Sequence, residues 1–88
     1  MRSVTVIGAG SWGTALAVHL ARVGHRVQLW ARDADLVADM NTRRANAVYL
    51  PDIGFPDMLE ATADLPGALG GAQFVVVAVP SHGLRQVL

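Results

Sequence analysis

The stretch Gly8–Gly13, which reads Gly-Ala-Gly-Ser-Trp-Gly, decides the fold of this chain, because it spells G-x-G-x-x-G after a short apolar run. The run Val4–Ile7 is rich in β-branched residues and predicts a buried strand that ends at the first glycine. After the glycines, apolar residues recur at helical spacing from Ser11 to Val23 and predict a helix. Strand, glycine turn and helix in this order are the context in which the motif binds a dinucleotide.

Each glycine of the motif has a separate task at the start of this helix. Gly8 permits a tight turn, Gly10 lets a diphosphate approach the backbone, and Gly13 lets the helix pack closely on the strand. The first N–H groups of a helix have no partner within it and lie at the positive end of its dipole. Ser11 offers a backbone N–H and a hydroxyl to the phosphates or caps the helix, and these two roles are compatible. Trp12 leans over the cofactor or packs beneath the sheet.

Composition argues against several classes of protein. The 88 residues carry a formal net charge of +0, whereas a nucleic-acid-binding surface needs an excess of basic residues. Because the chain has no cysteine, it has neither a disulfide framework nor a thiolate metal site. The longest apolar run, Phe74–Pro80, is far shorter than the roughly 20 residues that span a bilayer, and no secretory leader precedes the first strand. We therefore expect a globular protein of the cytoplasm that binds no nucleic acid and does not insert into a membrane.

Strands alternate with helices along the chain and predict a Rossmann-type parallel sheet with helices on both faces. The expected strands are Ser3–Ile7, Arg26–Trp30, Leu59–Thr62 and Gln73–Val79, and the expected helices lie near residues 11–23, 34–42 and 64–69. Right-handed crossovers give the strand order 3-2-1-4, in which the loop Gly8–Gly13 meets the loop Pro80–Gly83 where ligands bind in such sheets. A long connection, residues 41–57, is rich in Asn, Pro and Gly, and such connections are usually functional or disordered.

A complete dinucleotide-binding fold has two halves and commonly six strands. These 88 residues hold about one half and one further strand, and the last of them, Gly83–Leu88, read as the beginning of a helix. We therefore expect residues 1–88 to be the N-terminal part of a truncated Rossmann domain, without the C-terminal catalytic and substrate-binding domain.

The residues after the second strand bear on the choice of cofactor. An NAD-binding site places Asp or Glu about 20 residues after the glycines to hold the ribose 2′-hydroxyl. Here that position falls at Trp30, and Arg32 follows, whose guanidinium suits the 2′-phosphate of NADP. We interpret Asp33 as a helix cap rather than a ribose ligand. We expect NADP(H) to be preferred or tolerated, with NAD(H) left open. Tyr49, in the long connection, covers the adenine end of the cofactor or anchors the loop.

Four stretches of the sequence resemble the bacterial NAD(P)-dependent glycerol-3-phosphate dehydrogenases. They are Gly8–Ala17, Leu29–Asp33, Asn41–Pro51 and Val77–His82. The third, with Arg-Ala-Asn-Ala-Val-Tyr-Leu-Pro at its end, is the most distinctive, because generic dinucleotide-binding domains lack it. The resemblance implies reversible hydride transfer between a nicotinamide ring and dihydroxyacetone phosphate, which gives sn-glycerol 3-phosphate for phospholipid synthesis.

The resemblance also implies that Ser11, Trp12, Arg32 and Tyr49 contact the cofactor. Asp33 departs from the family pattern, in which this position is basic in some members. The catalytic lysines and substrate-phosphate ligands of the family lie beyond residue 88, and this chain contains no lysine. We therefore assign no catalytic residue, expect the chain alone to be inactive, and expect the longer protein to take the small-molecule substrate.

Two other functions stay open on the sequence. A related dehydrogenase of a hydroxy acid shares the opening strand and the glycine motif, although the stretch Asn41–Pro51 argues against it. A non-catalytic NAD(H)-sensing regulatory domain begins with the same fold, but it usually keeps an acid after the second strand. Whether the protein forms a homodimer also stays open.

Overall fold

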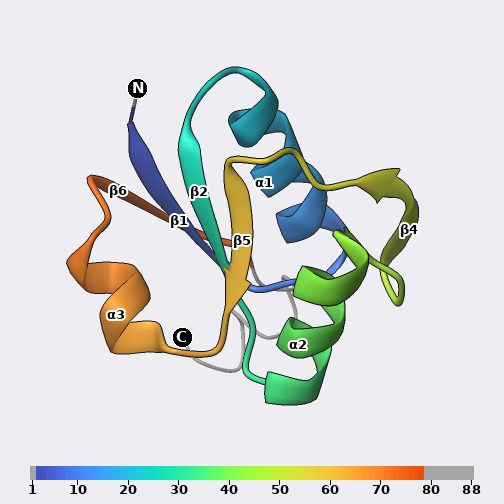
Figure 1. Ribbon diagram of the computed structural model, residues 1–88. Coiled ribbons are helices and arrows are strands. Elements are labelled where there is room, and N and C mark those ends of the chain that lie inside the picture. Colours follow the sequence, from blue (N-terminus) through green and yellow to red (C-terminus); the bar gives the residue numbers. More distant parts are fainter. Residues whose placement is uncertain (1, 79–88) are drawn as a thin grey trace.

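The centre of the protein is a parallel sheet of four strands, seen in a computed structural model that describes residues 2–78 (Figure 1). The strands are β1 (Ser3–Ile7), β2 (Arg26–Trp30), β5 (Leu59–Thr62) and β6 (Phe74–Val77). Their order in the sheet is β5-β2-β1-β6, which confirms the predicted order and the Rossmann-type fold.

The fourth strand is shorter than predicted, since it begins one residue later and ends at Val77. The end of β6 is set by its partner strand, β1, which ends at Ile7 because the glycine turn follows. Among the described residues, the last hydrogen bond between the two strands runs from the Ala78 N–H to the Ile7 carbonyl at 2.8 Å. The loop Pro80–Gly83 and the helix predicted after it lie outside the described residues.

Three helices cover the two faces of the sheet. Helices α1 (Ser11–Arg22) and α2 (Ala34–Arg43) lie on one face, and α3 (Leu65–Gly70) lies on the other (Figure 1). Asp33 accepts hydrogen bonds from the N–H groups of Asp35 and Leu36 at 2.9 and 3.3 Å, so it caps α2 as predicted. None of the described helices has the length and apolar character needed to cross a membrane.

The main core lies between the sheet and helices α1 and α2. It is built from small and branched side chains that are almost fully buried: Val4, Val6, Ala17, Val18, Val27, Leu29, Met40 and Leu59. Complete burial of one Val, Leu or Met side chain stabilises a fold by about 1.5–3 kcal/mol. On the opposite face the Thr5 hydroxyl of β1 donates a 2.6 Å hydrogen bond to the Ala68 carbonyl, which attaches α3 to the sheet.

The segment after α2 contains two strands that the sequence analysis treated as an irregular connection. Strands β3 (Ala45–Asn46) and β4 (Leu50–Gly54) form an antiparallel ribbon beside α1 and α2 (Figure 1). Its pattern was hidden because β3 has only two residues and β4 contains both proline and glycine. Arg44, the first residue of the segment, has a left-handed conformation with φ 56°, and this ends α2 at Arg43. The helix is thus one residue longer than predicted.

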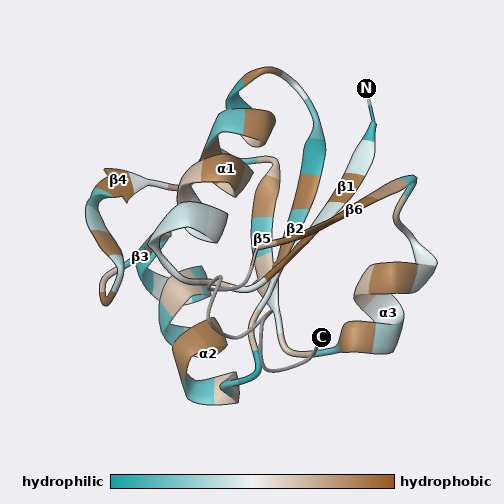
Figure 2. Cartoon of the chain, turned by 180° about the vertical axis from the view of Figure 1, so that it is seen from behind, coloured by the Kyte–Doolittle hydropathy of each residue, from teal (hydrophilic) through white to brown (hydrophobic). Residues whose placement is uncertain are grey.

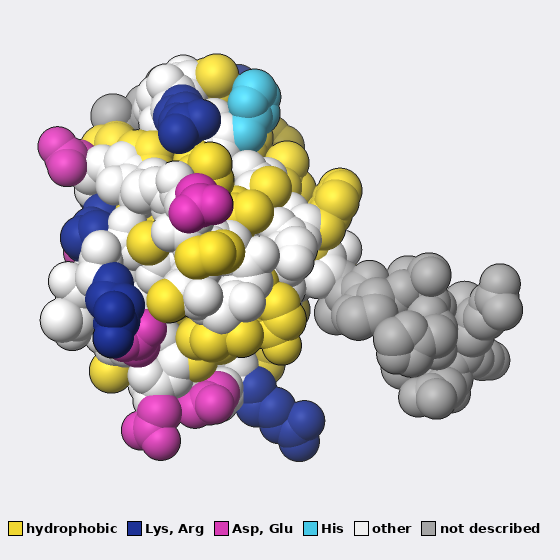
Figure 3. Space-filling view, turned by 90° about the vertical axis from the view of Figure 1, so that its right-hand side faces the viewer, with side chains coloured by type: hydrophobic (Ala, Val, Ile, Leu, Met, Phe, Trp, Pro, Cys, Tyr) yellow, Lys and Arg dark blue, Asp and Glu magenta, His cyan; other side chains and the backbone are white. Residues whose placement is uncertain are grey.

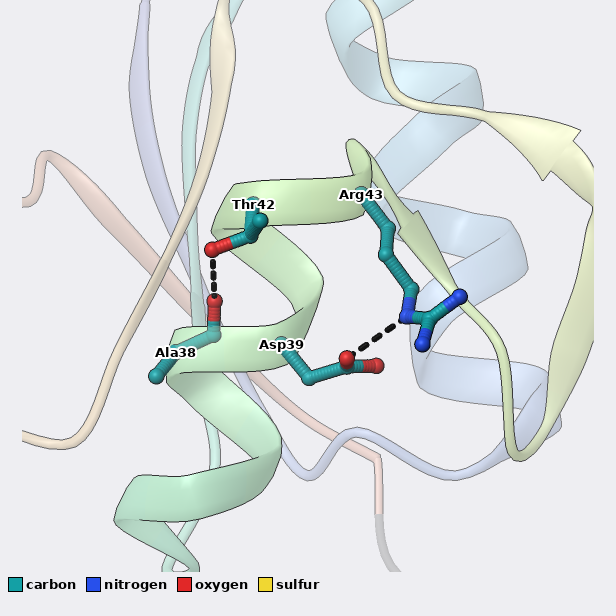
Figure 4. Close-up of polar contacts among 4 residues, drawn as sticks. All are labelled: Ala38, Asp39, Thr42 and Arg43. Atoms are coloured by element: carbon teal, nitrogen blue, oxygen red, sulfur yellow. Dashed lines mark hydrogen bonds and ion pairs between the residues drawn. The ribbon is translucent and has the colours of Figure 1, made fainter.

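The last turns of α2 are held by local contacts on the exposed side of the helix. Arg43 forms an ion pair with Asp39 at 2.6 Å, and the Thr42 hydroxyl donates to the Ala38 carbonyl at 2.9 Å (Figure 4). The hydrogen bond and the negative charge of Asp39 raise the pKa of Arg43. Exposed pairs of this kind add little stability because water screens them.

The outer edge of β5 is fully occupied by hydrogen bonds. In the parallel ladder with β2, Leu59 and Ala61 direct their backbone groups away from β2. The Asn41 side chain both donates to the Ala61 carbonyl and accepts from its N–H, each at 2.9 Å. The Leu59 carbonyl accepts from Arg44 at 2.7 Å, and the Leu59 N–H donates to the Pro56 carbonyl at 3.0 Å.

Strand β6, at the other edge, is apolar along its whole length (Figure 2). Phe74, Val75 and Val77 are about half exposed, and among the described residues β6 pairs with β1 only. Elsewhere the surface is mixed: on the face shown in Figure 3, basic and acidic side chains are interspersed and do not gather into a patch of one sign.

Candidate functional site

The glycine turn that joins β1 to α1 has the geometry expected of the motif. Gly8 has φ 112°, a conformation that side chains disfavour, so glycine is required for the turn itself. The Gly8 N–H donates to the Trp30 carbonyl at 3.0 Å, and this bond holds the turn against the end of β2.

Gly13 is required by packing inside the protein. A Cβ atom at this position would lie 2.0 Å from the Gly8 carbonyl oxygen and 3.1 Å from the Ala78 Cβ. Helix α1 therefore crosses the turn so closely that no side chain fits, which is the role predicted for this glycine.

Gly10 differs from Gly13, because the described part of the protein leaves open space around it. A Cβ atom built there would meet no heavy atom within 4 Å, and its φ of −74° is one that any residue adopts. Neither packing nor backbone conformation explains a glycine at this position. Open space beside the backbone is what the approach of a ligand would require.

The space next to Gly10 adjoins the N-terminus of α1. Within residues 2–78, no side chain caps this helix, so the capping role considered for Ser11 is wrong: the N-cap is Gly10. The first turn of the helix contains no acidic residue. The Thr14 N–H donates to the Gly10 carbonyl at 3.0 Å and begins the helical ladder, so the N–H groups before it have no partner in the helix. These N–H groups and the helix dipole favour an anion. This open space beside Gly10, called the hollow below, therefore suits the diphosphate of a dinucleotide.

Ser11 and Trp12 follow Gly10 directly at the start of α1, and Tyr49 is bonded to Ser11. The Ser11 hydroxyl donates a 3.2 Å hydrogen bond to the Tyr49 carbonyl, so the turn before β4 lies beside the start of α1. Trp12 is 64% exposed and Tyr49 49% exposed. The alternative that Trp12 packs beneath the sheet is therefore wrong, and both rings are free to lie against a ligand.

Arg32 follows the C-terminal end of β2, two residues after the Trp30 carbonyl that holds the glycine turn. It is exposed, and it forms no ion pair with another described residue. The Asp33 carboxylate next to it is engaged in capping α2, which leaves Arg32 as the charged group at this end of the strand that is free for a ligand.

Asn46 is a residue that the sequence analysis quoted but did not single out. It is fully buried and connects three segments around the hollow. Its amide donates to the Ala9 carbonyl at 2.8 Å and to the Thr14 hydroxyl at 2.9 Å, and its carbonyl accepts from the Tyr49 N–H at 3.2 Å. No local signal marks it, because its partners are up to 37 residues away in the sequence.

The structure thus brings Gly8, Gly10, Ser11, Trp12, Gly13 and Tyr49 together at the glycine turn and the start of α1. The Gly8–Trp30 bond joins this turn to the end of β2, two residues before Arg32. The sequence also pointed to the loop after β6, but Pro80–Gly83 lies outside the described residues.

Comparison with known proteins identifies the relatives of the chain. Residues 3–88 match the family described as NAD-dependent glycerol-3-phosphate dehydrogenase N-terminus. The curated glycerol-3-phosphate dehydrogenase [NAD(P)+] of Thioalkalivibrio sulfidiphilus is 55% identical over 85 residues, which are 97% of this chain and 26% of that protein. That of Escherichia coli O1:K1 is 51% identical over 86 residues, 98% of this chain and 25% of that protein. The chain spans about a quarter of the length of these curated relatives.

Solved structures agree with this comparison. The glycerol-3-phosphate dehydrogenase of Coxiella burnetii superimposes with a TM-score of 0.87 at 42% identity, covering 98% of this chain and 26% of that one. The enzyme of Saccharomyces cerevisiae superimposes with a TM-score of 0.82 at 32% identity, covering 98% and 28%.

Proposed function

The chain belongs to the family of NAD-dependent glycerol-3-phosphate dehydrogenase N-termini, and on that premise we propose that it is the cofactor-binding part of such an enzyme. The full-length protein would reduce dihydroxyacetone phosphate to sn-glycerol 3-phosphate with NADPH or NADH and supply glycerophospholipid synthesis. Family membership favours this function over the hydroxy-acid dehydrogenase and the NAD(H)-sensing domain.

The hollow at Gly10 is the observation that carries the proposal. It combines unpaired N–H groups at the start of α1, open space beside a glycine, and exposed rings at its border. These are the groups that a dinucleotide needs, since its diphosphate is anionic and its adenine and nicotinamide rings are flat and apolar on their faces. The residues present therefore fit NADP(H) or NAD(H).

In the proposed complex each site residue has a distinct task. Gly8 and Gly13 shape the turn, Gly10 admits the diphosphate, and Ser11 and Trp12 contribute backbone N–H groups to it. Arg32 pairs with the 2′-phosphate of NADPH. Tyr49 covers the adenosine part.

The nicotinamide of a bound cofactor would supply or accept the hydride, and the remaining chemistry needs a proton donor. Reduction of a ketone produces an alkoxide that a positioned acid must protonate. We find no candidate for that acid among the described residues, and the chain contains no lysine. We propose that a C-terminal domain supplies this acid, which accords with the quarter of the relatives' length that the chain covers. A water-soluble substrate and cofactor favour the cytoplasm as the location of this enzyme.

Titration of the chain with NADPH and NADH tests the cofactor proposal. Trp12 is exposed beside the hollow, so its fluorescence should change on binding. We expect saturable binding of at least one cofactor and no oxidation of NADPH when dihydroxyacetone phosphate is added. Absence of binding to both cofactors by a folded chain would contradict the proposal, and turnover by the chain alone would contradict the assignment of catalysis to another domain. Sedimentation of the full-length enzyme decides between a monomer and a homodimer.

A further inference from the structure

The side chain of Asn46 uses both of its amide donors and its carbonyl acceptor on the walls of the hollow. It is completely buried, and no buried side-chain polar atom in the described part of the chain lacks a hydrogen-bond partner. A buried amide that lost these bonds would cost free energy, so its position is strongly determined.

The bond from Asn46 to the Ala9 carbonyl bears directly on Gly10. The peptide between Ala9 and Gly10 is planar and trans, so its C=O and N–H groups point in opposite directions. Because Asn46 holds the Ala9 carbonyl toward the protein interior at 2.8 Å, the Gly10 N–H points away from Asn46. This N–H forms no hydrogen bond with another described residue, and the space around Gly10 is open.

The other two bonds of Asn46 fix the surroundings of this peptide. The bond to the Thr14 hydroxyl joins Asn46 to the first turn of α1, and the bond from the Tyr49 N–H joins it to the turn whose carbonyl accepts from Ser11. One side chain of the β3–β4 ribbon thus sets the glycine turn, the helix start and the Tyr49 turn relative to one another.

From this geometry we infer that Asn46 is a positioning residue, which aims the Gly10 N–H at the diphosphate of the cofactor. The inference rests on the proposed function, because it assumes that a dinucleotide occupies the hollow. It assigns to the β3–β4 ribbon a task in the site beyond the contact of Tyr49 with Ser11. Asn46 itself does not touch the ligand.

The substitution Asn46→Asp tests the inference with almost no change of shape. The introduced carboxylate still accepts from the Tyr49 N–H, but it cannot donate to the Ala9 carbonyl and repels its oxygen. The peptide is then free to rotate, and the diphosphate loses a charge-assisted hydrogen bond. We expect the affinity for NADH and for NADPH to fall by roughly ten- to a hundredfold at pH 8.

The pH dependence of the NADH affinity of Asn46→Asp distinguishes a loss of positioning from a general disruption of the fold. Burial beside a carbonyl oxygen raises the pKa of the introduced carboxyl group, because both disfavour its charged form. Once protonated, this group donates to the Ala9 carbonyl as the amide does. We therefore expect the affinity of the variant for NADH to approach that of the unaltered chain as the pH falls from about 8 to about 5.5, each value being compared with the unaltered chain at the same pH.

Asn41→Asp is the matched control. Asn41 also donates to a backbone carbonyl and accepts from a backbone N–H, but it does so on β5, away from the glycine turn. We expect this variant to keep its affinity for NADH while its thermal unfolding midpoint falls. Equal losses of affinity in the two variants, or a loss in Asn46→Asp that does not recover at low pH, would overturn the inference.

A second measurement is made on the unaltered chain, so it tests the inference even if the Asn46→Asp variant fails to fold. The amide resonance of Gly10 should shift downfield when NADH or inorganic pyrophosphate is added. If NADH binds and this resonance stays in place, the inference is wrong while the proposed function stands. If the unaltered chain binds no dinucleotide, the proposed function itself fails.

Discussion

Alanine substitutions at Gly10 and at Gly13 should have different effects: Gly13→Ala should lower the stability of the fold, and Gly10→Ala should weaken cofactor binding. Gly13→Ala places a Cβ atom 2.0 Å from the Gly8 carbonyl oxygen, whereas ordinary contact begins near 3.4 Å. The two atoms must move apart by more than an ångström. Neither side yields easily, because the Gly8 N–H is bonded to β2 and the adjoining Ala9 carbonyl is bonded to Asn46.

The magnitude follows from two opposing terms. Overpacking of a tightly packed site costs about 1–3 kcal/mol, and the upper part of this range applies because the contact is between backbone-fixed atoms. Alanine favours a helix over glycine by about 1 kcal/mol. The net loss of unfolding free energy is therefore about 1–2 kcal/mol, which lowers the thermal midpoint of a domain of this size by about 5–15 °C.

Gly10→Ala is the control and should show the opposite behaviour. Its methyl group meets no atom of residues 2–78 within 4 Å, so the midpoint should stay within about 3 °C of the unaltered chain. The same methyl group occupies the space proposed for the diphosphate, and NADH affinity should fall at least about tenfold. Circular dichroism on heating and a fluorescence titration measure the two effects. An unchanged midpoint in Gly13→Ala would refute the packing argument. Unchanged NADH affinity in Gly10→Ala would refute the proposal that the diphosphate binds beside Gly10.

Two further substitutions address the end of β2. Arg32→Ala should weaken NADPH more than NADH, by about 1–3 kcal/mol if the guanidinium forms a charge-assisted bond to the 2′-phosphate; parallel titrations measure this, and equal losses for the two cofactors would contradict the role of Arg32. Asp33→Ala removes the cap of α2 and should reduce the unfolding free energy by about 1 kcal/mol while NADH affinity stays the same. Asp64→Ala, which removes the cap of α3, is its matched control, and a selective loss of NADH affinity in Asp33→Ala alone would show that this carboxylate binds the ribose after all.

The sequence predicts the parts of this fold whose signals are local. The glycine motif and the apolar runs before and after it define β1, α1 and β2 to within a residue, and the right-handed crossover rule then orders the sheet. The sequence also predicts the cap at Asp33, because a carboxylate just before a helical pattern can accept hydrogen bonds from the first N–H groups of the helix.

The β3–β4 ribbon and the role of Asn46 could not be predicted in this way. Proline and glycine in β4 mask a strand, and the two residues of β3 are too few to show alternation. The partners of Asn46 lie in the glycine turn and α1, more than 30 residues earlier, so only the folded chain shows what this amide does. For the same reason, the sequence does not determine the exposure of Trp12, which depends on the packing of α1.

The two margins of the sheet have different consequences for assembly. Along β5, every outward backbone group of Leu59 and Ala61 is already hydrogen-bonded, by the Asn41 amide, the Arg44 guanidinium or the Pro56 carbonyl. A further strand therefore cannot pair with this edge. Along β6, one side of the backbone has no partner strand among the described residues and is available to a further strand. Within residues 2–78 the sheet is therefore open to a further strand at β6 and not at β5, so a larger protein or a neighbouring copy would extend it from β6.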